Sequence, residues 1–305
     1  MRIIRSLKFL SEFDRNVYLT LGSFDGLHIG HRSIINLMVS EANSAKATPV
    51  LFTFRKHPLS IIAPLKTPPI ITPFKKKMIL LKELGVEAVI CLKFTREFAQ
   101  INPEKFIKDI ICKTLKAKKI FIGPTYFFGK NRQGSPELLK SKADRYGYSV
   151  NVLDTVNVDG IAASSTKVRQ SVLSGEMGLA RALLGRPYSV QGKVVRGTSK
   201  GKVLGIKTAT LKIRSDLIPP DGVYFALADV SGIRHRALVN IGHQPTFGSY
   251  KRAIEVHIMG FDRDIYGEKM ETFFLERIRA EKRFESVSEL REQIEEDIRF
   301  VSSKS

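Results

Sequence analysis

Cysteine and long apolar runs are scarce in this 305-residue chain. Cys91 and Cys112 are the two cysteines, and they show neither metal-ligand spacing nor a disulfide framework, so we expect a reducing compartment. The apolar stretch near the N-terminus is too short for a signal-peptide core, and no run is long enough to cross a membrane. Internal repeats and low-complexity segments are absent as well. We therefore expect a cytoplasmic protein.

Acidic residues are also in deficit. The 50 lysines and arginines outnumber the 30 acids and give a net charge of +20, which attracts polyanions. Two interpretations are open, a non-specific affinity for nucleic acid or clefts that bind acidic small molecules such as nucleotides. The 43% hydrophobic and 26% charged residues indicate an ordinary globular protein, and the length allows two domains.

Strands alternate with helices up to about residue 185. Candidate strands lie at 17–21, 49–54, 86–94, 119–123 and 149–153. Helical patterns lie at 33–45, 73–84, 103–115 and 136–146. This alternation predicts an α/β domain with a mainly parallel sheet, whose ligands bind beyond the carboxyl ends of the strands.

The pattern changes after Gly185. Short strand candidates separated by glycine and proline turns lie at 189–195, 208–213, 223–230, 235–241, 253–259 and 271–276. They predict an antiparallel barrel or sandwich, and a helix with an acidic first turn is expected at 288–300. We place the boundary near Arg186-Pro187, which gives domains 1–185 and 186–305.

The clearest motif is GSFDGLHIGH, residues 22–31, between a strand and a helix. His28 and His31 stand at a helix entrance, where unpaired backbone N–H groups and the helix dipole favour anions. Their imidazoles could donate hydrogen bonds to charge developing on a phosphoryl group. A glycine-rich turn with incidental histidines is one alternative. A zinc site is another, although no third ligand lies nearby.

A second motif, SSTKVR at residues 164–169, precedes a helical pattern. Its serines and threonine can cap that helix. Lys167 and Arg169 lie in the first turn, where basic residues cost stability unless an anion binds there. The motif therefore indicates a triphosphate site, with an ordinary cap and solvated bases as the alternative.

The two motifs together resemble the adenylyltransferase module of bacterial bifunctional riboflavin kinase/FMN adenylyltransferase (FAD synthetase). The resemblance implies a Rossmann-like nucleotidyltransferase fold. It also implies that the FMN phosphate attacks the α-phosphate of ATP and that pyrophosphate leaves without a covalent enzyme intermediate. His28 and His31 would stabilise the transition state. The residues implied to bind ATP and its phosphates are Gly22, Ser23, Phe24, Asp25, Gly30, Ser164, Ser165, Thr166 and Arg169.

Two further segments match the family less closely. In TFRKHP, residues 53–58, Arg55 and Lys56 replace the family's acid and proline. Residues 123–134 resemble its flavin-contacting loop, with Thr125 in place of an acid or Asn and Phe127 in place of an Arg. Aromatic and basic side chains suit a flavin ring and its phosphate, and they also suit a nucleobase. The implied flavin contacts are His57, Thr125, Tyr126, Phe128 and Arg132.

The C-terminal half contains its own candidate site. Between Gln191 and Arg214 there are seven basic residues and no acid, so the glycines there could form a phosphate loop or a solvated hairpin. The segment 240–247 predicts a tight turn. Glu255 and His257 share one face of a strand, and a carboxylate there could accept a proton from an alcohol or simply face solvent.

The ordered segments LGIKTATL, PPDGVY, NIGHQPTF, EVHI, DIYG and RAEKRF resemble the riboflavin kinase module of the same family. The resemblance implies a six-stranded barrel with Glu255 as base for the ribityl 5′-hydroxyl. Asn240 and Arg279 would then lie close to the flavin. Magnesium-ATP would bind near Thr208, and the other implied ATP contacts are Gly197 and Lys202.

One departure bears on the kinase. The family reads P-T-A-N where this chain has Lys207-Thr208-Ala209-Thr210. The missing proline removes a rigid turn, and the hydroxyl of Thr210 reaches less far toward Mg²⁺ than an amide oxygen does. Thr208 and Thr210 are the candidate metal ligands, and Lys207 could bring charge to a phosphate. We predict a kinase that is present but weakened or differently tuned.

Three hypotheses follow. The first is an enzyme that converts riboflavin to FMN and FMN to FAD, with ATP and Mg²⁺ as cofactors and flavins as substrates and products. The second keeps the adenylyltransferase and has an impaired kinase module. The third is a basic RNA-binding protein, which predicts stripes of basic residues with stacking aromatics. The order of the motifs favours the first, with small-molecule substrates, no specific nucleic acid and no membrane. The oligomeric state stays open.

Overall fold

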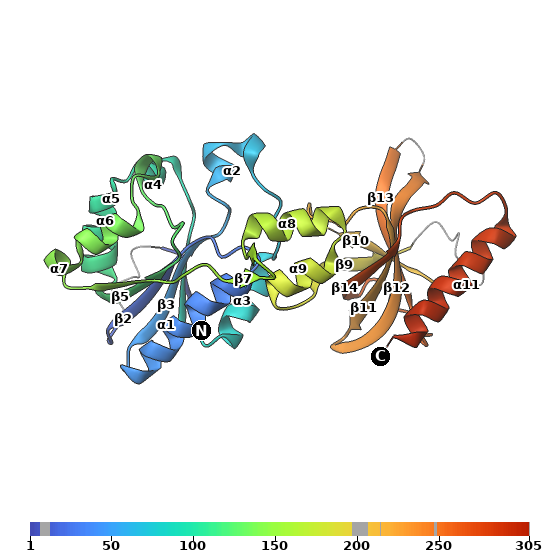
Figure 1. Cartoon of the computed structure of the whole chain (residues 1–305), viewed down its shortest axis with the longest axis horizontal. Helices are drawn as coiled ribbons and strands as arrows, with labels where there is room; N and C mark the ends of the chain where they lie inside the picture. Colours follow the sequence, from blue (N-terminus) through green and yellow to red (C-terminus); the bar gives the residue numbers. More distant parts are fainter. Residues whose placement is uncertain (7–12, 197–206, 214, 247–248, 305) are drawn as a thin grey trace. The chain divides into compact units, whose positions relative to one another are not determined.

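Residues Met1–Ser165 and Thr166–Ser305 form two separate units in the computed structural model of the chain (Figure 1). The structure describes residues 1–6, 13–196, 207–213, 215–246 and 249–304. Helices α8 (Ser165–Ser174) and α9 (Met177–Leu184) fall almost wholly in the second unit, and α9 packs on its strands β9 and β14. The functional domain boundary expected at 185/186 stays a prediction.

The N-terminal unit is built on a six-stranded parallel sheet with the order β1-β4-β3-β2-β5-β6. Its strands are β1 (Arg2–Ile4), β2 (Val17–Leu21), β3 (Thr48–Phe54), β4 (Ala88–Leu92), β5 (Ala117–Ile122) and β6 (Ser149–Val152). Its longer helices are α1 (Ile29–Ser44), α3 (Phe74–Glu83), the π-helical η3 (Phe106–Thr114) and α6 (Pro136–Ser141). The shorter elements are α2 (Leu59–Ile62), η2 (Pro64–Lys66), α4 (Arg96–Ala99), α5 (Pro103–Lys105), η4 (Lys130–Arg132), α7 (Ala143–Tyr146) and the hairpin of β7 (Asn157–Val158) and β8 (Ile161–Ala162).

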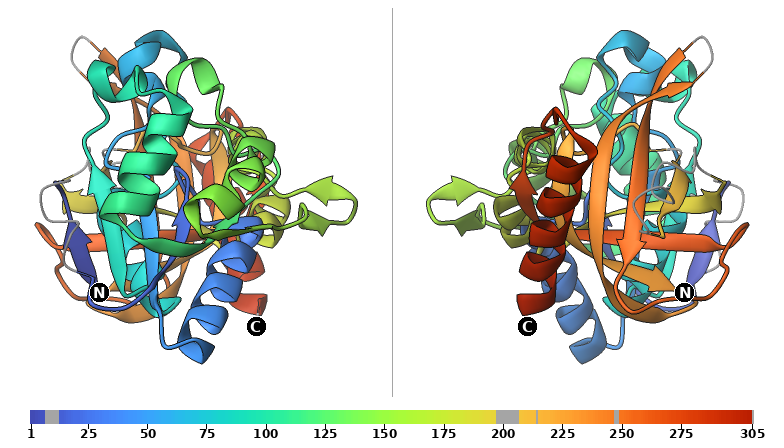
Figure 2. Two further views of the ribbon diagram at one scale, coloured as in Figure 1. Left: turned by 90° about the vertical axis from the view of Figure 1, so that its left-hand side faces the viewer. Right: turned by 90° about the vertical axis from the view of Figure 1, so that its right-hand side faces the viewer.

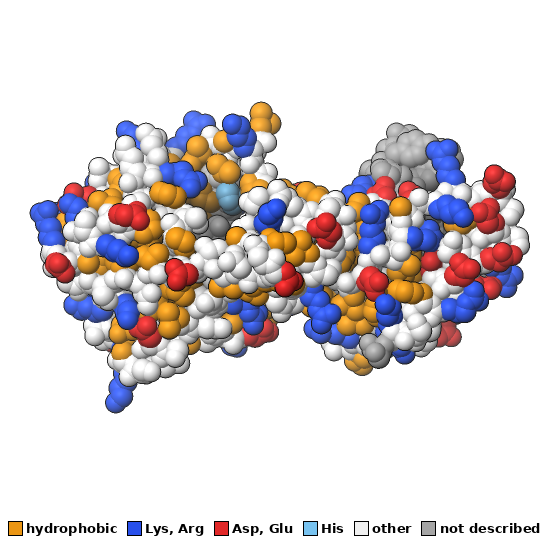
Figure 3. All heavy atoms as spheres, viewed as in Figure 1, with side chains coloured by type: hydrophobic (Ala, Val, Ile, Leu, Met, Phe, Trp, Pro, Cys, Tyr) orange, Lys and Arg blue, Asp and Glu red, His pale blue; other side chains and the backbone are white. Residues whose placement is uncertain are grey.

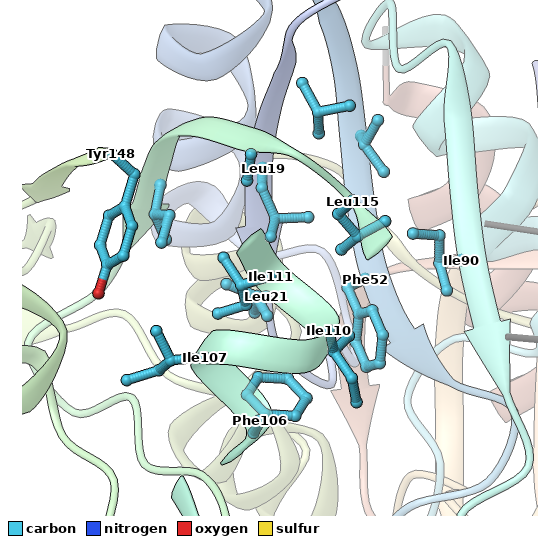
Figure 4. Packing of buried hydrophobic residues seen from close by; sticks show 14 of the residues in the cluster. Leu19, Leu21, Phe52, Ile90, Phe106, Ile107, Ile110, Ile111, Leu115 and Tyr148 are labelled. Carbon is cyan, nitrogen blue, oxygen red and sulfur yellow. The ribbon is translucent and has the colours of Figure 1, made fainter. Parts of the chain in front are cut away.

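Both faces of this sheet are covered, which explains its nearly continuous apolar strands. Alternate residues of each strand point to opposite faces, so Val50 and Phe52 join one core cluster and Leu51 joins the other. Helix η3 supplies Phe106, Ile107, Ile110 and Ile111 to the first cluster (Figure 4). Helices α1 and α3 cover the opposite face. The predicted α/β domain is confirmed.

The second unit contains a closed six-stranded antiparallel barrel with the order β10-β13-β12-β11-β14-β9. Its strands are β9 (Tyr188–Val195), β10 (Ala209–Ile213), β11 (Gly222–Val230), β12 (Ile233–Thr246), β13 (Ser249–Ile258) and β14 (Lys269–Arg279). Helix α11 (Val287–Ser303) lies along the outside of the barrel (Figure 2). Val301 of this helix is fully buried against Val223, Phe225 and Leu238. The expected barrel and closing helix are both confirmed.

The structure corrects several element predictions. Residues 240–246 do not form the expected tight turn, because β12 continues to Thr246 and pairs with β13 as far as Ser249, whereas Phe247 lies outside the described residues. Cross-strand pairing there outweighs the local turn preference of Gly242 and Pro245. The helix expected at 136–146 is two helices, which meet at Lys142. Strand β1, helix α9 and the β7–β8 hairpin, which stands away from the sheet in Figure 2, were not predicted.

Candidate functional site

The loop between β2 and α1 places two histidines against each other. His28 is 6% exposed and is the N-cap of α1, where its Nδ1 accepts a hydrogen bond from the His31 backbone N–H at 3.4 Å. The proton of neutral His28 is then on Nε2. The two imidazole rings stack with centroids 3.6 Å apart. Gly30 leaves room for this arrangement, since a Cβ there would lie 3.2 Å from Cε1 of His28.

The environment of His31 keeps its ring neutral. Burial lowers the pKa of His31 well below its usual value of 6.5, and the charges of His28 and Lys77 lower it further. The edge of the ring packs against Phe24, with centroids 5.0 Å apart. Nδ1 of His31 is buried and has no hydrogen-bond partner among the described residues. A neutral imidazole with a spare nitrogen can donate to, or accept from, a group that enters the site.

Asp25 connects this loop to two other segments. Its carboxylate is 9% exposed and accepts hydrogen bonds from the backbone N–H groups of Ile71 and Thr72, at 3.1–3.2 Å. The carbonyl oxygen of Asp25 accepts a hydrogen bond from Oγ of Ser165 at 2.8 Å. The first residue of α8 is therefore attached to the histidine loop, and half-buried Ser164 precedes it. The loop hydrogen bonds indicate that Asp25 acts by positioning the residues around it.

The remaining residues of the two motifs are described within their own units. The Gly22 N–H donates to the carbonyl of Phe52 on β3 at 3.1 Å, which fixes the start of the loop. Phe24 has a positive φ of 48° and is 2% exposed, so its ring anchors the loop in the core under α1. Thr166 and Arg169 lie in the first turns of α8, with Thr166 exposed and Arg169 half-buried.

A lysine that the motifs did not indicate lies beside the histidines. Lys77 of α3 is only 7% exposed, and its Nζ donates to the carbonyl oxygen of Ser23 at 3.0 Å. Burial lowers the pKa of Lys77, while the negative charge of Asp25 opposes that shift. The sequence carries a signal for it. Lys77 follows Phe74 by three residues and precedes Leu81 by four, so it falls on the apolar face of its helix.

Lys77 also lines a pocket of the N-terminal unit. The pocket extends from Ser23 and Asp25 to the segment Arg55, Lys56 and His57. The Nδ1 atom of His57 accepts a hydrogen bond from the backbone N–H of Leu59 at 3.2 Å. In Figure 3 a histidine side chain shows on the N-terminal unit with basic and hydrophobic side chains around it.

The predicted flavin loop is a tight, glycine-dependent turn. Phe128 and Gly134 exchange backbone hydrogen bonds of 3.0 and 2.9 Å, and a Cβ on Gly134 would lie 2.7 Å from the Phe128 ring. The guanidinium of Arg132 lies over the ring of Phe127, 5.1 Å from its centroid, and that ring is 45% exposed. Thr125 is exposed. The loop thus presents an aromatic ring and a cation to solvent.

Aromatic rings connect this loop to the pocket. Ring contacts lead from Phe54 in the pocket wall to Phe98, Phe106 and Phe128, with centroid distances of 5.3, 6.1 and 5.4 Å. Tyr126 stacks on Phe128 at 5.6 Å, and burial raises the pKa of its hydroxyl, which therefore stays protonated. A continuous set of packed rings therefore holds the loop and the pocket wall in a fixed relation.

In the second unit, the candidate kinase residues form a row across the barrel. Thr210 on β10 pairs with Glu255 on β13, and Glu255 pairs with Asn240 on β12. The row continues through Val223 to Arg279. Directly paired residues share a face of the sheet, and Val223 packs under α11, so the row lies on the outer face of the barrel. Glu255 is half-buried between two residues that can hydrogen-bond.

Arg279, one predicted flavin contact, has a structural partner. Its Nε and one terminal nitrogen donate to the carboxylate of Asp297 on α11, the shortest distance being 2.7 Å. Asp297 is 3% exposed. This ion pair attaches the closing helix beside the row, and the predicted flavin contact of Arg279 stays a prediction.

Lys207, which stands where the family has a proline, also has a partner in the structure. The Lys207 ammonium forms an exposed ion pair with Asp262, which lowers the pKa of that carboxyl group. The carbonyl oxygen of Lys207 lies 2.8 Å from Nδ1 of His257. Thr208 is exposed, whereas Thr210 is half-buried in the strand. The charge of Lys207 is thus directed at Asp262 in this structure.

Two predicted ATP contacts, Gly197 and Lys202, lie outside the described residues. Among the residues that are described, no three His, Cys, Asp or Glu side chains are grouped as ligands for a metal ion. A Mg²⁺ ion bound mainly by nucleotide phosphates and water needs fewer protein ligands.

Two family models match this chain. The FAD synthetase model matches residues 10–167, and the riboflavin kinase model matches residues 184–304. The chain belongs to the bifunctional riboflavin kinase/FMN adenylyltransferase family. The member from Escherichia coli K12 is 34% identical over 301 residues, 97% of this chain and 96% of that protein. The member from Bacillus subtilis is 31% identical over 294 residues, 93% of this chain and 92% of that protein.

One solved structure has the same fold as the present chain. It is described as a macrolide-efflux protein from Streptococcus pneumoniae, with 31% identity, a TM-score of 0.90 and 99% of each chain covered. None of the helices in the described part of the present chain is long and apolar enough to cross a membrane. The family matches place the histidine loop in the FAD synthetase domain and the Thr210–Glu255–Asn240 row in the riboflavin kinase domain.

Proposed function

We propose that this chain converts riboflavin to FMN at the barrel and FMN to FAD in the N-terminal unit, with ATP as the second substrate of each reaction. The carrying observation is that each of the two matched domains contains its own constellation of polar side chains. These are the stacked histidine pair at the start of α1 and the Thr210–Glu255–Asn240 row on the outer barrel face.

In the adenylyl transfer, an oxygen of the FMN phosphate attacks the α-phosphorus of ATP. The bond from that phosphorus to the α–β bridging oxygen breaks, and pyrophosphate leaves. The N-terminus of α1 and the imidazole rings of His28 and His31 stabilise the extra charge on the phosphoryl oxygens. Ser164, Ser165, Thr166 and Arg169 bind the triphosphate at the start of α8. Positioning and charge stabilisation are most of what this chemistry requires.

In the kinase reaction, Glu255 accepts the proton of the ribityl 5′-hydroxyl while the hydroxyl oxygen attacks the γ-phosphorus of ATP. The bond from the γ-phosphorus to the β–γ bridging oxygen breaks, and ADP leaves. General-base catalysis by Glu255 would accelerate the reaction by a factor of roughly 10²–10⁴. Asn240 beside Glu255 would orient the flavin. The hydroxyls of Thr208 and Thr210 fit a Mg²⁺ ion, which prefers oxygen ligands and would neutralise the ATP phosphates.

Features of the barrel also support the second hypothesis, an adenylyltransferase with an impaired kinase module. Thr210 stands directly opposite Glu255, where its short hydroxyl replaces the amide of the family pattern, and Lys207 is paired with Asp262. These features support a kinase that is weaker than the adenylyltransferase. The basic RNA-binding alternative has less support. On the face seen in Figure 3, lysines and arginines alternate with acids and apolar residues and form no stripe.

A chromatographic time course tests the proposal. Riboflavin with ATP and Mg²⁺ should give FMN and then FAD, and FMN with ATP and Mg²⁺ should give FAD directly. His28→Asn should abolish FAD formation and spare FMN formation, while Glu255→Gln should do the reverse. FAD from FMN alone would leave the barrel an impaired kinase. FAD from neither substrate would overturn the assignment.

A further inference from the structure

The pocket beside the histidine loop has an unbalanced charge. Arg55, Lys56 and Lys77 line it together with His57, and Asp25 is its single acid. The carboxylate of Asp25 already accepts the hydrogen bonds of the 71–72 backbone. The pocket can therefore take a negative group without displacing one of its own.

Two of these cations have no acidic partner in the part of the chain that the structure describes. Arg55 and Lys56 are both exposed, and neither side chain forms a salt bridge with any residue that the structure describes. Both occupy positions where the family pattern has an uncharged or acidic residue. Lys77, which lines the same pocket, is buried, and its Nζ donates a hydrogen bond to the Ser23 carbonyl. An anion near the first two residues would meet a preorganised positive field.

Most of the remaining wall of the pocket is apolar, apart from Ser23 and Thr72. Phe54, Pro58, Pro68, Ile70 and Phe74 contribute rings and aliphatic groups. A pocket that combines apolar side chains with cationic ones suits a ligand that joins an aromatic ring system to a phosphate. A neutral flavin would contact the apolar side chains but would bring no negative charge to pair with the cations.

We infer that Arg55 and Lys56 hold the phosphate of FMN and make this pocket select the phosphorylated flavin over neutral riboflavin. The inference rests on the proposed function and adds a specificity device to it. Two anionic phosphates must approach each other for the attack on ATP, and cations beside the attacking phosphate reduce that repulsion. Riboflavin, the substrate of the other domain, then competes poorly for the adenylyltransferase site.

The test compares three constants in FAD formation by the full chain. They are the KM for FMN, the KM for ATP, and the inhibition constant of lumiflavin, which has the ring system without a ribityl chain or phosphate. The variants are Arg55→Gln with Lys56→Gln, and Arg55→Glu. Lys75→Gln is the matched control, because Lys75 is an exposed lysine of α3 outside the pocket.

The double variant should raise the KM for FMN about tenfold, which corresponds to losing roughly one charge-assisted hydrogen bond. Arg55→Glu should raise it further, while the lumiflavin constant, the KM for ATP and the Lys75→Gln enzyme stay unchanged. An unchanged KM for FMN, or a rise in the KM for ATP instead, overturns the inference. If the wild-type chain makes no FAD, the proposed function fails. The inference is then decided by equilibrium dialysis, where wild type must bind FMN more tightly than the double variant does.

Discussion

Replacing Asp297 by asparagine should loosen helix α11 from the barrel. The carboxylate is 3% exposed and accepts three hydrogen bonds of 2.7–3.1 Å from Arg279, whose side chain is 21% exposed. Removing one partner of a buried pair costs roughly 3–5 kcal/mol, because the other charge stays desolvated. Since Arg279 retains some contact with water, we expect about 3 kcal/mol, at the lower end of that range.

That loss is measurable by hydrogen exchange in the peptide 287–303. A change of about 3 kcal/mol corresponds to a roughly hundredfold faster exchange from the opened helix. The apolar contacts of Val301 are the same in both proteins, so the difference isolates the ion pair. Glu295→Gln is the control, because its pair with Arg291 is exposed and worth only a few tenths of a kcal/mol. Exchange of Asp297→Asn at the wild-type rate would refute the reasoning.

Three further outcomes are expected. Because burial lowers the pKa of His31, the acid limb of FAD formation should lie well below pH 6.5. Lys77→Gln removes a charge that lowers this pKa further, so it should move the limb upward, and an unshifted pH–rate profile contradicts this. Gly134→Ala should destabilise the N-terminal unit by about 1–3 kcal/mol in urea unfolding, since the new Cβ meets the Phe128 ring, and an unchanged midpoint argues against that contact. Thr210→Asn should increase kcat/KM for riboflavin several-fold, and ordinary magnesium dependence without a gain would show that the hydroxyl is no handicap.

Much of the architecture could be predicted because periodicity is local. The strands of the N-terminal sheet are buried on both faces and read as apolar runs, and the barrel strands are separated by glycine and proline turns. The end of β12 could not be read in this way. Its residues Asn240–Thr246 resemble a turn locally, and only the partner strand β13 keeps them extended.

The candidate site was only partly predictable for a similar reason. The histidine pair and the serine cap are contiguous motifs, so the sequence displays them directly. Lys77 is one of three successive lysines, and only the fold decides which of them is buried. The partners of Arg279 and Lys207 are likewise distant in the sequence, so their ion pairs with Asp297 and Asp262 could not be foreseen.

His28 is at once a proposed catalytic group and the residue that begins α1. A mutation to alanine therefore removes a cap, usually worth about 1 kcal/mol, along with the imidazole. In evolution, a substitution of this histidine lowers the stability of the fold and abolishes the activity at the same time, unless the new residue can itself cap the helix. Lineages that abandon the reaction should therefore be found with Asn, Asp or Ser at this position more often than with Ala.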